Sequence, residues 1–220
     1  MLIDLAKENG DLSRLHSTGD LFSQIIDPWL IRDGTDAVLS NDIRLKCMQA
    51  IAVHALGGGG RPLTYRAINE YCDPILQPVS AKERDEFNSD IRNCGVLRRL
   101  AKDEFEFQHA LFYEYCIART VFEDVKNVDF DVFGMYPFTN EVVDFIVELT
   151  RKSNYTSQVR EVVSEVWKED ISSTARANLL RVHCALGGDC GGFDFRNIVT
   201  RFPTPRFLVE SSTIDTVRMA

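Results

Sequence analysis

Apolar side chains recur every three or four positions along most of the chain, as they do on the buried face of a helix. The firmest such segment runs from Asp42 to Leu56. The four glycines at 57–60 then end it, because glycine lowers helix stability. Residues 1–40 carry the same spacing in shorter stretches and are predicted to form a separate helical segment. The pattern therefore predicts a mainly α-helical protein.

Residues 41–125 are predicted to form a winged-helix domain. After the first helix, a second is expected from Pro62 to its end at Pro74, and a third follows it. The apolar period then shortens, and two extended runs at 96–100 and 105–107 predict a small β-hairpin. Three helices followed by a hairpin is the order typical of a winged helix.

Residues 137–187 are predicted to form a helical domain, joined to the preceding part by a linker at 130–137. Thr139 is suited to cap the first helix of this domain, since its hydroxyl can accept a hydrogen bond from a free N–H group. The helices predicted on either side of the linker lie at 109–125, 139–149, 156–168 and 173–186.

Residues 188–220 lose the helical period. Several glycines interrupt the chain, and apolar residues then recur five positions apart, as Phe193 and Ile198 do. A five-residue period is typical of a pentapeptide-like β-solenoid, although a repeat architecture needs about three stacked units. A short, truncated solenoid and an irregular tail are equally good interpretations of this segment.

Composition places the chain among ordinary globular proteins. It has 220 residues, of which 45% are hydrophobic and 26% charged. No apolar run approaches the roughly 20 residues that span a bilayer, and the first residues lack the order of a signal peptide. We therefore expect a cytoplasmic protein without membrane contact. The net charge of −8 argues against broad nucleic-acid binding, which requires a basic surface.

No metal site is expected. None of the cysteines forms a C-x-x-C pair, and no histidine lies at a zinc-site spacing from two of them. We expect reduced, mostly buried thiols at Cys47, Cys72, Cys94, Cys116, Cys184 and Cys190.

No catalytic residue is expected either. The glycines at 57–60 are followed by Arg61 and Pro62, not by the lysine and hydroxyl residue of a phosphate-binding loop, so a flexible connection is the better interpretation. No histidine lies in a nucleophile motif. The chain is thus predicted not to be an enzyme by itself. The histidines considered are His16, His54, His109 and His183.

His109 is distinguished by its position between the second extended run and the helix at 109–125. It should lie near the helix N-terminus, where the dipole and the free N–H groups favour an anion. An imidazole at this point can donate a hydrogen bond to a phosphate. The alternative is a histidine that only caps its own helix, and the residues alone favour that alternative.

The segment around His109 resembles the motif F-x-F-x-H-x-x-F-x-E-Y-x-x-A, which closes the winged-helix domain of NACHT-type STAND ATPases. Gly95-Val96-Leu97 is similar to a strand of the same family, and the resemblance extends over about residues 2–124. The positions that match the motif are Phe105, Phe107, His109, Phe112, Glu114, Tyr115 and Ala118.

This resemblance implies a regulatory switch in a signalling protein, with prokaryotic defence as a candidate setting. In the family, the matching histidine contacts the β-phosphate of bound ADP and helps to hold the closed state, so His109 is implied to bind nucleotide. The printed sequence has neither a Walker A lysine nor a Walker B acidic run. ADP or ATP is therefore expected only together with an ATPase core, upstream in a longer protein or on another chain.

Two other functions remain open at this stage. A winged-helix transcription regulator is the first, and Arg61, Arg66, Lys82 and Arg84 would contribute to its DNA-binding surface. The acidic residues interspersed in the third helix argue against it, because they repel phosphate. The second is a helical adaptor that binds another protein through an exposed apolar patch.

Overall fold

The structure is a computed structural model and describes residues 40–58, 62–82 and 96–191, together with positions 84, 85, 87 and 193. Within this part of the chain, seven helices and three strands have defined bounds, and residues 81, 82, 84, 85 and 87 are helical as well. The helices are α3 (Asn41–Gly57), α4 (Tyr65–Leu76), α6 (Ala110–Asn127), α7 (Asp131–Met135), α8 (Asn140–Lys152), α9 (Thr156–Val166) and α10 (Ser173–Ala185). The strands are β1 (Leu63–Thr64), β2 (Leu97–Ala101) and β3 (Glu104–Phe107).

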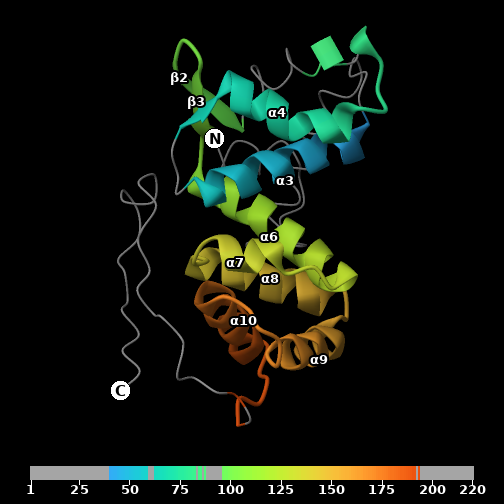
Figure 1. Cartoon of the computed structure of the whole chain (residues 1–220), viewed down its shortest axis with the longest axis vertical. Helices are drawn as coiled ribbons and strands as arrows, with labels where there is room; N and C mark the ends of the chain where they lie inside the picture. Colours follow the sequence, from blue (N-terminus) through green and yellow to red (C-terminus); the bar gives the residue numbers. More distant parts are fainter. Residues whose placement is uncertain are drawn as a thin grey trace, which may run out of the picture.

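The prediction of a mainly helical fold with a small β-hairpin is confirmed for the described residues. Helices α3 and α4 and the sheet lie at one end of the molecule, and α8, α9 and α10 lie at the other (Figure 1). Helix α6 lies between them and packs against both α3 and α8. The helical segment at 1–40 and most of the tail at 188–220 lie outside the described residues.

The sheet is antiparallel and has the strand order β1-β3-β2. The hairpin of β2 and β3 was predicted, but β1 was not, because Leu63 and Thr64 were expected to be helical. Leu63 is instead buried and lies opposite Phe105 in the sheet. Thr64 caps the following helix, since its hydroxyl accepts a hydrogen bond from the Ala67 N–H at 3.1 Å.

Helix α4 does not end at Pro74, as the sequence had indicated, but continues to Leu76. A proline inside a helix removes one backbone hydrogen bond. Burial of three apolar side chains four residues apart offsets that loss, because a regular helix is needed to place them on one face. These side chains are Ile68, Cys72 and Leu76.

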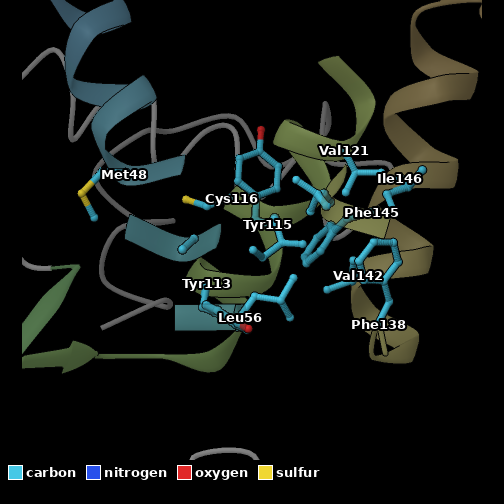
Figure 2. Packing of buried hydrophobic residues seen from close by; sticks show 14 of the residues in the cluster. Met48, Leu56, Tyr113, Tyr115, Cys116, Val121, Phe138, Val142, Phe145 and Ile146 are labelled. Carbon is cyan, nitrogen blue, oxygen red and sulfur yellow. The ribbon is translucent and has the colours of Figure 1, made fainter. Parts of the chain in front are cut away.

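The start of α6 is buried around its whole circumference, whereas the sequence had indicated a single apolar stripe. Every residue from Phe112 to Ala118 is buried. Figure 2 shows why: Tyr115 and its neighbours on α6 lie between Met48 and Leu56 of α3 and the apolar face of α8. The Tyr115 ring meets the Phe145 ring edge-on, with centroids 5.5 Å apart. Helix α6 is therefore the central helix of the core.

The predicted linker at 130–137 contains a short helix, α7. Its isolated sequence is too short to be stable as a helix, but Phe133 is fully buried and packs on Phe138 at 5.4 Å. Asn178 of α10 also holds this segment, since its side-chain amide donates to the Phe133 and Tyr136 carbonyl oxygens, both at 2.9 Å. Packing from a distant part of the chain thus determines this helix.

The helices after the linker lie close to their predicted positions. Thr139 caps α8 as expected, because its hydroxyl accepts from the Val142 N–H at 3.2 Å. Ser172 caps α10 in the same way, from the Ala175 N–H at 3.1 Å. None of the helices in the described part of the chain is long and apolar enough to cross a membrane.

Candidate functional site

His109 lies at the junction of β3 and α6, at the N-cap position of the helix, in agreement with the predicted position. Its backbone is extended, with φ −136° and ψ 136°, and its side chain is exposed. The imidazole ring lies 6.2 Å from the ring of Phe112, one turn into the helix. The side chain makes no capping hydrogen bond. His109 is therefore the N-cap residue of α6 by its backbone, while its imidazole takes no part in capping.

The N-terminus of α6 carries no acidic residue in its first turn. The first N–H groups of a helix have no partner inside the helix, and the helix dipole adds partial positive charge there. The His109 side chain does not accept a hydrogen bond from any of them, and its backbone carbonyl oxygen accepts only from the Phe112 N–H, at 3.1 Å. The His109 imidazole can donate one hydrogen bond to an anion, and backbone N–H groups of the first helical turn can donate others, as in phosphate sites at helix ends.

Most other positions of the motif around His109 lie in the core, and Phe107 is half-buried against it. Phe105, Phe112, Tyr115 and Ala118 are all buried. These residues anchor β3 and the first turns of α6, so the backbone on both sides of His109 is held by packing. The motif therefore combines one exposed polar side chain with a rigid apolar support.

Glu114 is the exception within the motif, because it is a carboxylate with only 2% of its surface exposed. Its Oε1 accepts a hydrogen bond from the Thr139 hydroxyl at 2.9 Å. Burial raises the pKa of Glu114 to about 7, while the bond from Thr139 opposes this rise and the charge of Glu141 adds to it. This carboxyl group therefore keeps its proton to a higher pH than an exposed glutamate does.

The Thr139 hydroxyl joins α6 to α8. It donates to Glu114 and accepts from the Val142 N–H, so it links the second turn of α6 to the first turn of α8. The sequence gives one indication of this contact, because Glu114 lies among apolar residues on a helix. The pattern does not predict that its partner is Thr139, 25 positions away.

The remaining histidines of the described residues have structural surroundings. The His54 ring stacks on the Tyr71 ring at 3.8 Å. His183 is buried, and its Nε2 lies 3.1 Å from the Asp189 carbonyl oxygen. No group of three or more acidic, histidine or cysteine residues in the described part is arranged to hold a metal ion.

The expectation of mostly buried thiols holds for part of the chain only. Cys47, Cys72 and Cys116 are buried, but Cys184 is exposed and Cys190 is half-buried. The last two lie at the end of α10 and just beyond it, where the helix leaves the core. Cys94 lies outside the described residues.

The basic residues proposed for a DNA-binding surface are engaged with the protein itself. Arg66 is paired with Glu70, Nε to Oε1 at 2.7 Å. Arg84 donates to the carbonyl oxygens of Leu76 and Gln77, each at 3.1 Å. Arg61 lies outside the described residues.

Comparisons with family models, with characterised proteins and with solved structures give no match for this chain.

Proposed function

We propose that the chain is the regulatory part of a NACHT-like STAND ATPase, in which His109 contacts the phosphates of a bound nucleotide. The chain would not catalyse a reaction by itself. It would bias a nucleotide switch whose P-loop core stands in the same protein or on a partner chain, in signalling or defence. The single observation that carries this proposal is the exposed imidazole of His109 at a helix N-terminus that has no side-chain cap.

The arrangement of residues 41–125 supports a winged helix as the setting of this site. Helix α3, strand β1, helix α4, further helical positions at 84, 85 and 87, and then β2 and β3 follow in the order of that fold. The strand order β1-β3-β2 also fits a winged helix, because β3, the second strand of the hairpin, lies between β1 and β2. Strand β1 adds support that the sequence pattern did not provide.

Helix α6 offers a physical route from His109 to the C-terminal helices. It begins directly after His109, packs against α8 and is joined to α8 by the bond between Glu114 and Thr139. We propose that ligand detection by the C-terminal part shifts an equilibrium between closed and open arrangements through this helix. A ligand shifts such an equilibrium only by its differential affinity for the two states, and nucleotide at His109 would favour the closed one.

The alternative of a DNA-binding regulator is less well supported. Two exposed arginines on β2, the strand that would form the wing, also contact the protein itself. Arg98 is paired with Glu106, and Arg99 donates to the Ala101 and Lys102 carbonyl oxygens. These contacts occupy some of the guanidinium N–H groups that would otherwise bind phosphate.

The proposal is tested by measuring ADP retention of the protein that joins this chain to an ATPase core. We expect His109→Ala to weaken ADP binding about tenfold or more, because a hydrogen bond to a charged group contributes about 1.5–3 kcal/mol. The matched control is Gln108→Ala. Gln108 is exposed and directly precedes His109, so this change should leave ADP affinity unaltered.

Equal ADP affinity of His109→Ala and the unchanged protein would refute the role of His109. Steep, salt-dependent binding of the chain to duplex DNA would favour the transcription regulator instead. A second check is genetic: the coding sequence of an ATPase core, with a P-loop and a Walker B strand, should adjoin the sequence that encodes this chain.

A further inference from the structure

Two thiols face each other where α10 ends. Cys184 lies in the last turn of α10 and is exposed, and Cys190 lies six residues further on and is half-buried. Their Sγ atoms are 3.0 Å apart. A disulfide needs an S–S distance of about 2.05 Å, so a local movement of about 1 Å would join them.

The loop between these cysteines is held in a defined conformation. Gly187 adopts φ +76°, a left-handed conformation that ends the helix, and its N–H donates to the Cys184 carbonyl oxygen at 2.9 Å. The Gly188 N–H donates to the His183 carbonyl oxygen at 2.9 Å. A Cβ at position 188 would overlap the His183 ring, so any residue other than glycine would have to displace that ring.

His183 fixes the far side of the same loop. It is buried, and its Nε2 contacts the carbonyl oxygen of Asp189, the residue before Cys190. The Cys190 thiol also approaches the Gly188 carbonyl oxygen at 3.9 Å. Contacts on both sides of the loop therefore hold the backbone that joins the two cysteines.

We propose that Cys184 and Cys190 form a peroxide-sensitive dithiol, which closes to an intramolecular disulfide on oxidation and reopens on reduction. This inference is independent of the nucleotide role of His109. The proposal assigns a covalent modification to a segment for which the sequence pattern predicted only the end of a helix.

The chemistry requires one molecule of hydrogen peroxide for each disulfide. The Cys184 thiolate attacks one peroxide oxygen, the O–O bond breaks, and the departing hydroxide takes up a proton to become water, which leaves Cys184 as a sulfenic acid. The Cys190 sulfur then attacks the Cys184 sulfur. The S–O bond breaks, and the hydroxyl leaves as water with the Cys190 proton. Two electrons pass from the sulfurs to peroxide.

The surroundings of the two sulfurs suit these different roles. Cys184 is the more exposed, so peroxide reaches it first. Burial, the hydrogen bond with Cys184 and the nearby Asp189 carboxylate raise the pKa of Cys190 to about 11. Cys190 is therefore a weaker nucleophile toward peroxide than an ordinary thiol, and its resolving role rests on its position 3.0 Å from the Cys184 sulfur.

The chain contains its own controls in the buried cysteines. Cys47 and Cys72 are adjacent in the core, with the Cys72 Sγ 3.9 Å from the Cys47 carbonyl oxygen, but neither is exposed. Cys116 is also buried, and burial raises its pKa to about 12. Peroxide should leave all three cysteines unmodified while the protein is folded, because a cysteine reacts only when peroxide can reach its sulfur and the thiol is ionised to the thiolate.

The test treats the reduced full chain with hydrogen peroxide, alkylates the remaining thiols and analyses tryptic peptides by mass spectrometry. Arg181 and Arg196 bracket a single peptide that contains both cysteines. We expect this peptide to resist alkylation and to be lighter by two hydrogens than its reduced form. Dithiothreitol should restore both thiols, and the peptides of Cys47, Cys72 and Cys116 should be alkylated only after denaturation.

Single serine variants test the assigned order. Cys190→Ser should retain a sulfenic acid at Cys184 that dimedone traps, whereas Cys184→Ser should react slowly and form no adduct at Cys190. Oxygen addition without a bridge in the unchanged chain would overturn the proposal. Bridges between separate chains, or equal oxidation of the buried cysteines in the folded protein, would overturn it as well.

Discussion

Replacing the buried carboxyl group of Glu114 should change how the stability of this protein depends on pH. Glu114→Gln keeps the shape of the side chain and an oxygen that can accept the Thr139 hydrogen bond, but it cannot ionise. Burial raises the pKa of Glu114 to about 7 in the folded chain, from an ordinary value of 4.5. The folded state therefore binds more protons than the unfolded state between these two pH values.

The direction of the pH effect on stability follows from this difference in bound protons. A raised carboxyl pKa contributes stability that is fully present below about pH 4.5 and is lost as pH rises through about 7. Each pKa unit corresponds to about 1.4 kcal/mol, so the whole loss is about 3 kcal/mol. Between about pH 5 and about pH 8 the unchanged protein should lose roughly 2.5 kcal/mol through this group, and Glu114→Gln should not.

Urea unfolding of both proteins at these two pH values measures the effect. The free energy of unfolding of Glu114→Gln, relative to the unchanged chain, should rise by roughly 2.5 kcal/mol from the lower to the higher pH. Other titrating groups, such as Asp124, are present in both proteins and cancel in this comparison. Glu161→Gln on the exposed face of α9 is the matched control and should show no such rise. Parallel stability curves for Glu114→Gln and the unchanged protein would refute the reasoning.

Two further substitutions test contacts of α10. Asn178→Ala should lower the free energy of unfolding by about 3 kcal/mol or more, measured by urea unfolding, because it leaves two buried backbone groups and one part-buried one without their partner. Gly188→Ala should cost about 1–3 kcal/mol in the same assay, because its Cβ would displace the His183 ring. Gly57→Ala is its control, since a Cβ there meets no atom within 4 Å, and an equal loss at both glycines would contradict this explanation.

The helices of the described residues were largely readable from the sequence. Apolar spacing located α3, α6, α8, α9 and α10 to within a few residues, and Thr139 was correctly identified as the cap of α8. These are local properties, because a helix closes its hydrogen bonds within itself and a cap acts across three positions. His109 could be placed at the start of α6 for the same reason.

The elements that the sequence did not predict depend on distant partners. Strand β1 exists because Leu63 pairs with Phe105, and α7 exists because Phe133 packs on Phe138 beneath the side chain of Asn178. No local pattern specifies such contacts, since strand pairing and burial are decided by residues far away in the chain.

In the candidate site, too, some features follow from the local sequence and others from tertiary packing. The sequence by itself determined that His109 would lie beside a helix N-terminus, with apolar residues at the positions that support it. Only the tertiary structure decided that its side chain is exposed and makes no capping bond, and that Glu114 is buried against Thr139. It also decided that Cys184 and Cys190 meet beyond α10. The exposure and the pKa of a side chain depend on the packing around it, and that packing is assembled from segments that are far apart in the chain, whereas the two thiols meet through the local conformation of one loop.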